Sequence, residues 1–251
     1  MRIVQIGLDL LLCIFKTFLG GGLLYYKLQL FNSSNVKRIV KHYSLEEIQG
    51  WSRFYRANFV NSLSGFKPVS LIGTTHESGE FNLAIFSNIV HLGADPTLIG
   101  FINRPREAAP HTLANIEQNL FYTINHISPE YIDKAHQTSA KYPEGISEFE
   151  MVGLTPEIKI DFKAPFVKES MIQYAMELVE VVSIKHNNTF LVIGKMIHAF
   201  VEPSYVGEDG FIDLVKAQSV VSLGLDGYGI ATALQRFSYA KPDQRLTTLG
   251  S

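Results

Sequence analysis

Cysteine is almost absent from this chain, and so is any excess of charge of one sign. Cys13 is the only cysteine among 251 residues, which excludes an intrachain disulfide and cysteine-rich zinc sites. A single cysteine also favours a reducing compartment, so we expect a cytoplasmic protein. The 22 Lys and Arg residues against 24 Asp and Glu residues give a formal net charge of -2, without a basic block. Because non-specific nucleic-acid binding depends on phosphate neutralisation, we expect no nucleic-acid partner.

Sequence signatures of several enzyme classes are missing as well. There is no GxxxxGK[ST] loop, no G-x-G-x-x-G that opens a helix after a strand, and no G-x-S-x-G nucleophile elbow. The 8 histidines are scattered, and none forms H-E-x-x-H or another tight pair of metal ligands. We therefore expect no metal site, and we predict no catalytic acid, base or nucleophile.

Apolar residues, in contrast, are plentiful enough for a folded core. Hydrophobic residues make up 46% of the chain and charged residues 18%, which excludes a fully disordered protein. The length corresponds to one or two domains of typical size. No repeat, low-complexity tract or interdomain linker is visible in residues 41–251. We therefore predict a single domain over residues 41–251.

Residues 1–40 form an apolar leader or extension that differs in composition from the rest. Residues 3–26 carry two internal charges and a run of three glycines, which fit a membrane-spanning helix poorly. No A-x-A-like cleavage site marks a signal peptide. Three interpretations remain open: a membrane or signal segment, a packed N-terminal helix, or a translation start at Val40. We expect membrane contact only if residues 1–36 are a real segment of the protein.

A helix is predicted to open this domain. Ser44 and Glu47 fit the S-x-x-E capping box of a helix N-terminus. The helix that they open places apolar side chains at helical spacing, which predicts a stripe facing the core: Ile48, Trp51, Phe54 and Tyr55.

Short strands dominate the remainder of the chain. Strands are predicted at 69–74, 97–102 and 121–125, a strand or loop at 81–89, and a helix at 111–119. Two long apolar runs, 176–184 and 190–200, are joined by Lys185–Asn188, whose asparagines tolerate left-handed turn geometry. Many short strands with few helices indicate a mainly β protein with flanking helices, in which an antiparallel barrel is favoured over a parallel sheet.

Two segments would suit an anionic cofactor. The first, Asn82–Asn88, mixes small, apolar, amide and hydroxyl residues, and it could lay backbone polar groups along a planar heterocycle or form an ordinary edge strand. The second joins Arg104-Pro105-Arg106 to Pro110-His111-Thr112 at a helix start. Guanidinium groups, a hydroxyl and helix N-terminal amides together make a phosphate site, although an N-cap beside surface arginines is the alternative. Both segments together favour a phosphorylated aromatic cofactor.

The same segments carry a family resemblance. The motifs are Asn82-x-Ala84-x-Phe86-Ser87, Asp95-Pro96, Arg104-Pro105, His111-Thr112-x-x-Asn115-Ile116, Tyr122-x-Ile124-Asn125, Ala135–Ala140, Gly145-x-Ser147-Glu148-Phe149 and Ala164-Pro165-x-Val167-x-Glu169-Ser170. In this order and spacing they resemble the flavin reductase-like family with its FMN-binding split-barrel fold. The resemblance spans about residues 54–243 and does not reach residues 1–36.

The resemblance implies FMN across one end of a six-stranded barrel, at the interface of a homodimer. It implies that Asn82 and the Leu83–Phe86 backbone contact the ring or ribityl chain, that Ser87 and Asn88 form hydrogen bonds there, and that Arg104, His111 and Thr112 hold the phosphate. His111 departs from the family, which more often shows an acidic residue or Ser there. No role follows for Lys168 or Glu169. The implied cofactor-binding residues are Asn82, Leu83, Ala84, Phe86, Ser87, Asn88, Arg104, His111, Thr112, Asn125 and Ser139.

Two functions follow from the resemblance. The first is an NAD(P)H:flavin oxidoreductase, in which hydride passes from a nicotinamide nucleotide as co-substrate to the flavin. Because the chemistry belongs to the cofactor, the lack of a visible acid–base pair is explained. The alternative is a non-enzymatic FMN-binding or flavoredoxin-like electron-transfer protein. A barrel without flavin, membrane-attached or purely structural, is the remaining interpretation.

Overall fold

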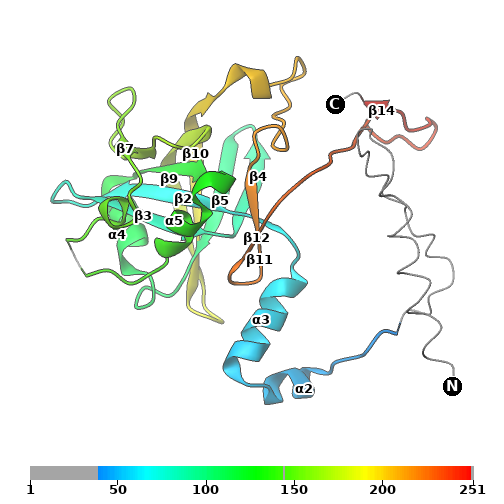
Figure 1. The fold of residues 1–251 in the computed structure, drawn as a ribbon, viewed down its shortest axis with the longest axis horizontal. Coiled ribbons are helices and arrows are strands. Elements are labelled where there is room, and N and C mark those ends of the chain that lie inside the picture. The colour runs from blue at the N-terminus through cyan, green and yellow to red at the C-terminus, as the bar shows by residue number, and fades with distance from the viewer. Residues whose placement is uncertain (1–38, 144, 250–251) are drawn as a thin grey trace, which may run out of the picture. The chain divides into compact units, whose positions relative to one another are not determined.

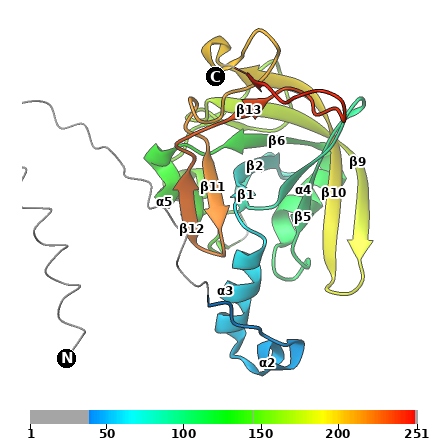
Figure 2. The ribbon, with the colours of Figure 1, turned by 90° about the vertical axis from the view of Figure 1, so that its right-hand side faces the viewer.

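Seven antiparallel strands form the main sheet of this computed structural model, which describes residues 39–143 and 145–249. The order is β3-β2-β6-β9-β10-β5-β4, so that β3 and β4 are the two edge strands. Only Ser87 and Asn88 separate these two edges along the chain. Figure 2 shows the sheet curling into an open barrel, with the β9–β10 hairpin as a long arm. Its strands are β2 (Ser70–Thr75), β3 (Phe81–Phe86), β4 (Ile89–Ala94), β5 (Thr97–Asn103), β6 (Phe121–His126), β9 (Ile172–Ile184) and β10 (Thr189–Val201).

Short helices and small sheets flank the main sheet (Figure 1). Of the helices, α4, α5 and α6 all contact β3, and α4 also contacts β2. The helical segments are α2 (Leu45–Gly50), α3 (Arg53–Leu63), α4 (Pro110–Asn119), η2 (Pro129–Tyr131), α5 (Ile132–Gln137), α6 (Glu148–Val152) and η3 (Pro203–Tyr205). The small sheets combine β1 (Lys67–Pro68), β11 (Val220–Leu223) and β12 (Gly227–Ile230); β7 (Pro156–Glu157) and β8 (Phe166–Val167); and β13 (Arg236–Phe237) and β14 (Thr248–Leu249).

The core is divided by β2, which is buried on both faces. Successive side chains of a strand point to opposite faces, so Leu71 joins one apolar cluster and Ile72 another. The cluster around Leu71 includes Phe149 of α6, and the cluster around Ile72 includes Leu113 and Ile116 of α4. The apolar faces of α4 and α6 thus hold these helices against the two sides of the sheet edge.

The strand predictions are confirmed, with one difference in the count. Residues 81–89 were expected to form one strand or loop, whereas the structure contains β3 and β4 with a break at Ser87–Asn88. The main sheet therefore has seven strands instead of the expected six. The long runs form the β9–β10 hairpin, and Asn188 has a φ of 56° in its turn, as the asparagines predicted.

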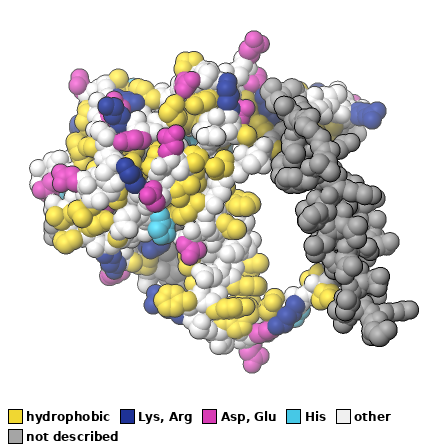
Figure 3. Space-filling model, in the orientation of Figure 1, with side chains coloured by type: hydrophobic (Ala, Val, Ile, Leu, Met, Phe, Trp, Pro, Cys, Tyr) yellow, Lys and Arg dark blue, Asp and Glu magenta, His cyan; other side chains and the backbone are white. Residues whose placement is uncertain are grey.

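The prediction of a core-facing stripe after Ser44 is wrong. The helix ends at Gly50 and a new one begins at Arg53, and neither contains a buried residue. Phe54 and Tyr55 are 77% and 58% exposed, and hydrophobic side chains lie open on the surface around these helices (Figure 3). The aromatic rings pack on one another, since Trp51 lies edge-to-face against Tyr55 at 4.9 Å. Helical spacing places side chains next to one another on one face, and that face can contact either the core or only its own side chains.

Some expectations concern residues that the structure does not describe. Cys13, the apolar segment 3–26 and the leader up to residue 38 lie outside the described residues. Within 39–143 and 145–249, no helix is long and apolar enough to cross a membrane.

Candidate functional site

A cavity of about 280 Å³ opens where the β3–β4 connection, the start of α4 and residues 138–142 meet. It lies beside the break between the two edge strands, because Phe86, Ser87 and Asn88 line it. A smaller chamber of about 40 Å³ adjoins the cavity and shares Asn82, His111 and Glu148 with it.

Most residues expected to bind a cofactor line this one cavity. Both predicted segments meet here although they are separated in sequence by β4 and β5. The residues in the wall are Asn82, Ala84, Phe86, Ser87, Asn88, Arg104, His111, Thr112 and Ser139. Their contacts with a cofactor stay predictions, but the structure brings them together.

Two further residues that the resemblance implied, Asn125 and Leu83, do not line the cavity. The Asn125 side chain is fully buried and is used within the protein: its amide donates to the Leu71 carbonyl at 3.2 Å, and its Oδ1 accepts from the Val167 amide at 3.0 Å. The Leu83 side chain belongs to the core, and its backbone N–H donates to Glu148 Oε2 at 2.9 Å. The Asn125 side chain therefore connects β6 to β2 and β8, and a cofactor contact of Asn125 or of the Leu83 backbone stays a prediction.

The N-terminus of α4 forms one wall of the cavity. Its N-cap is Ala109, whose side chain offers no hydrogen-bond acceptor, and Pro110 in the first turn has no N–H. The first amides of a helix have no partner within the helix and carry the positive end of its dipole. The His111 and Thr112 amides are therefore suited to an anion at a place where both residues line the cavity.

Two arginines precede this helix, and they lie in different surroundings. Arg104 is exposed and lines the cavity. Arg106 instead forms a two-point ion pair with Glu117, with its Nη2 2.6 Å from Oε1, and lies over the Phe190 ring at 4.8 Å. Of the two arginines, Arg104 is therefore the one placed to meet an anion in the cavity.

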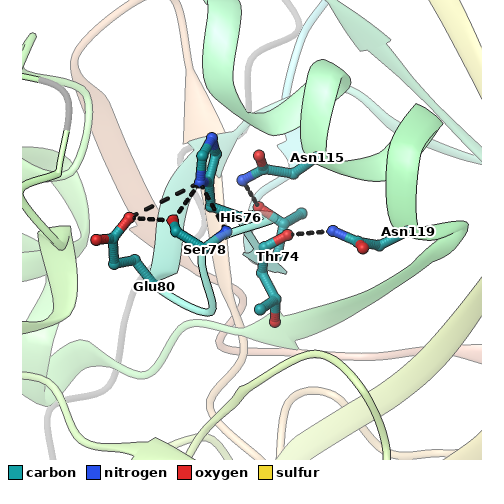
Figure 4. Close-up of polar contacts among 7 residues, drawn as sticks. Thr74, His76, Ser78, Glu80, Asn115 and Asn119 are labelled. Carbon is teal, nitrogen blue, oxygen red and sulfur yellow. Dashed lines mark hydrogen bonds and ion pairs between the residues drawn. The ribbon is translucent and has the colours of Figure 1, made fainter.

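A network of amides and hydroxyls connects β2, β3 and α4 behind the cavity wall. Thr74 Oγ1 accepts from Asn115 Nδ2 at 3.0 Å and from Asn82 Nδ2 at 3.2 Å. Asn82 Nδ2 also donates to Thr112 Oγ1 at 3.3 Å. One turn later, Asn119 of α4 donates to the backbone of β2, to the Thr75 carbonyl at 2.6 Å (Figure 4). These contacts fix where the start of α4 sits against β3.

A buried carboxyl group lines both the cavity and the smaller chamber. Glu148, at the start of α6, is 7% exposed and accepts from the Leu83 N–H on the open side of edge strand β3. Burial raises the pKa of Glu148 above its usual range, and the hydrogen bond from Leu83 opposes this effect. Glu148 thus pairs an edge amide that β2 cannot reach.

The smaller chamber borders the β2–β3 turn. His76 Nδ1 and Glu80 Oε2 both lie 2.5 Å from Ser78 Oγ, all within five residues of one turn (Figure 4). Ser78 Oγ, the Ser78 N–H and Glu80 Oε2 all approach His76 at the same ring nitrogen, Nδ1. In a Ser-His-acid triad the serine and the acid contact different ring nitrogens, so this turn differs from such a relay. Among the described residues, no group of three or more His, Cys, Asp or Glu side chains is arranged to bind a metal.

Sequence reasoning missed several wall residues, among them Lys141, Tyr142 and Glu148. Glu148 belongs to the motif Gly145-x-Ser147-Glu148-Phe149, but the neighbouring sequence does not predict its contact with β3. Lys141 and Tyr142 directly follow the Ala135–Ala140 motif, which was the available signal. Glu169, which had no predicted role, accepts from the Thr155 amide at 3.1 Å, and neither it nor Lys168 lines the cavity.

Comparisons with known proteins agree with this fold. Residues 65–215 match the flavin reductase like domain. A solved structure from Shewanella frigidimarina NCIMB 400, whose name calls it a flavin reductase with split barrel domain, is 47% identical, with a TM-score of 0.77 over 80% of this chain and 100% of that one. Nitrilotriacetate monooxygenase component B from Bacillus cereus is 19% identical, with a TM-score of 0.68 over 78% of this chain and 98% of that one.

A third structure shares the fold at low identity. Flavoredoxin of Desulfovibrio vulgaris (Miyazaki F) is 22% identical, with a TM-score of 0.60 over 71% of this chain and 92% of that one. The matched residues 65–215 include the main sheet, α4 and all the walls of the cavity. The chain belongs to the flavin reductase-like family and has its split-barrel fold.

Proposed function

We propose that this protein binds FMN in the 280 Å³ cavity and acts as an NAD(P)H:flavin oxidoreductase. The observation that carries the proposal is the meeting of two different walls in one cavity. One wall is the β3 segment with its amide and hydroxyl groups, and the other is the open N-terminus of α4 beside Arg104. A planar polar ring and a phosphate require these two kinds of surface.

The residues present fit a flavin mononucleotide. Arg104, Thr112 and the first amides of α4 would hold the phosphate, because they supply charge and hydrogen-bond donors at one end. Asn82, Ser87 and Asn88 would bind polar groups of the ribityl chain and ring edge, and Ala84 and Phe86 supply apolar surface. One such anion site favours FMN over FAD.

The proposed reaction requires the protein mainly to bind and orient the flavin. A bound flavin supplies the hydride and electron transfer itself. The protein's contribution is to hold the ring, to neutralise the phosphate, and to leave one side of the cavity open to a nicotinamide nucleotide. No acid–base pair is therefore needed in the wall.

Two assays test the proposal. Released cofactor separated by HPLC should be mainly FMN, and a preparation that contains mainly FAD would overturn the choice of cofactor. The purified protein should oxidise NADH or NADPH when free FMN is added. A yellow protein without this activity would be a flavoredoxin-like electron carrier or a binding module, and a protein that takes up no flavin would reject both functions.

We further propose that the protein forms a homodimer with the flavin near the interface. The β9–β10 hairpin presents apolar side chains to solvent, with Val179 55% and Val182 37% exposed. Its tip borders the cationic segment, because Arg106 lies over Phe190. A second copy would cover this surface. Sedimentation should show a dimer, and a compact monomer at micromolar concentration would contradict this.

A further inference from the structure

A fully buried hydroxyl lies behind the cavity wall, without lining the cavity itself. Thr74 on β2 is 0% exposed. Its Oγ1 accepts from Asn82 on β3 and from Asn115 on α4, at 3.2 and 3.0 Å. Figure 4 shows Thr74 facing Asn115 across the gap between strand and helix. One oxygen therefore joins two elements, β3 and α4, that both supply residues to the cavity wall.

Asn82 is the donor in both of its side-chain hydrogen bonds. Its Nδ2 carries two hydrogens, and these reach Thr74 Oγ1 and Thr112 Oγ1 at 3.2 and 3.3 Å. Both donors of the side chain are thereby committed within the protein. Asn82 is left with its carbonyl oxygen, an acceptor, as the group that it can offer to a ligand.

Thr112 is the acceptor in its hydrogen bond with Asn82. Its Oγ1 accepts from Asn82, so its own hydroxyl hydrogen remains to be donated. Thr112 lines the cavity in the first turn of α4, where the helix amides also point as donors. The hydroxyl and the amides therefore present hydrogens to the same end of the cavity.

We propose that Thr74 is a positioning residue that sets these directions for the flavin. Through Asn82 and Thr112 it makes the site offer an acceptor to N–H or O–H groups of the flavin, and a donor to its phosphate. This inference rests on the proposed binding of FMN. Thr74 itself contacts no ligand, so its effect passes entirely through the two cavity residues.

The chain offers a matched control in the next residue of the same strand. Thr75 Oγ1 donates to the Lys163 carbonyl at 2.7 Å, and successive strand residues point to opposite faces. Thr75→Val therefore makes the same chemical change and breaks one side-chain hydrogen bond, and it keeps the backbone carbonyl that accepts from Asn119 and all contacts of Thr74 Oγ1. Thr74→Ser keeps the hydroxyl and serves as the rescue variant.

The test is titration of the full-length apoproteins with FMN and with riboflavin, followed by flavin fluorescence, with thermal unfolding measured alongside. Thr74→Val should weaken FMN binding about tenfold, because two amide donors lose their acceptor and Asn82 is free to turn. Riboflavin, which has no phosphate for Thr112 to meet, should lose less. Thr74→Ser should bind FMN within about twofold of the unaltered protein, and so should Thr75→Val.

The outcomes separate the inference from the function on which it rests. If the unaltered protein takes up no FMN, the proposed function falls. If it binds FMN and Thr74→Val binds equally well, the inference is overturned, as it is if Thr75→Val loses as much. Should Thr74→Val not fold, Thr74→Ala removes the hydroxyl without adding a second methyl. It should show the same preferential loss of FMN, and equal binding would overturn the inference.

Discussion

Arg104 and Arg106 show how two residues of one type, two positions apart, can lie in different surroundings. Arg106 is committed to Glu117 and Phe190 on the outer surface, and Arg104 lines the cavity. The sequence motif Arg104-Pro105-Arg106 could not distinguish them, because both lie beside the start of the helix. Their different surroundings make each a control for the other.

Arg104→Ala should weaken FMN binding about tenfold and leave riboflavin binding nearly unchanged. The reason is the loss of a charge-assisted hydrogen bond to the phosphate, a group that riboflavin lacks. Fluorescence titration of both ligands measures the difference. Arg106→Ala, the matched control, should leave both affinities as they are. An equal loss of both ligands in Arg104→Ala would indicate a general disturbance of the fold instead.

His126 should make the stability of the fold depend on pH. Burial lowers the pKa of His126 to about 4, and its Nδ1 lies 2.8 Å from Ser219 Oγ. Between pH 6.5 and 4 the unfolded chain takes up a proton that the folded chain does not, so stability is lost as pH falls through this window. Because the side chain keeps some solvent exposure, we expect a loss of about 2 kcal/mol.

Urea unfolding between pH 7.5 and 4.5 measures this dependence. Glu148 contributes with the opposite sign, because burial raises its pKa and its protonation favours the folded state. The comparison with His126→Asn isolates the histidine, since that variant should lose its part of the slope. Identical slopes in the two proteins would show that His126 is not the group responsible.

Strands β6 and β10 lie on either side of β9 and meet through one aromatic side chain. Tyr122 of β6 is fully buried, and its Oη has no hydrogen-bond partner among the described residues. Gly194 of β10 leaves room for it, since a Cβ there would lie 2.1 Å from Tyr122 Oη. The glycine thus permits a close approach between elements that are not paired with each other.

Gly194→Ala should destabilise the protein by about 2 kcal/mol, because the new methyl group overlaps the tyrosine hydroxyl. Tyr122→Phe should be neutral or stabilising by about 1 kcal/mol, because a buried hydroxyl without a partner is removed. In the double variant, the cost of the alanine should shrink. Urea unfolding of the four proteins gives this coupling directly. Strictly additive effects would argue against the contact.

At the scale of elements, the sequence predicted what local patterns can encode. Alternation and turn residues placed β2, β5, β6 and the β9–β10 hairpin, and the helix-start motif placed α4 within one residue. The spacing of Phe54 and Tyr55 led to the wrong prediction of a buried face. The same spacing occurs in a core-facing stripe and in an exposed aromatic cluster. Glu148 and Thr74 could not be assigned, since their partners are remote in sequence and no local pattern identifies them.

At the scale of the whole molecule, the cavity follows from the open barrel. The two edge strands β3 and β4 are consecutive in the chain but are not paired, so their connection and the helix beside it remain accessible. Glu148 closes part of the free edge by accepting from Leu83. A fully closed sheet would leave no such opening beside Ser87 and Asn88.

A chain that begins at Lys41 should fold, remain soluble and hold flavin. The family match covers residues 65–215, and residues 45–251 make a compact unit of their own. Circular dichroism, gel filtration and the flavin absorbance of the shortened and full-length proteins measure this. If the shortened protein aggregates, or is colourless while the full-length protein is yellow, residues 1–40 are needed for the fold.

A crystal structure of the protein with FMN tests the central claim most directly. We expect the phosphate within hydrogen-bond distance of the Arg104 guanidinium, the Thr112 hydroxyl and the first amides of α4. The ring should lie along the Asn82–Phe86 strand, with Asn82 Oδ1 accepting from the flavin. A flavin bound outside this cavity, or a phosphate directed away from the start of α4, would contradict the account.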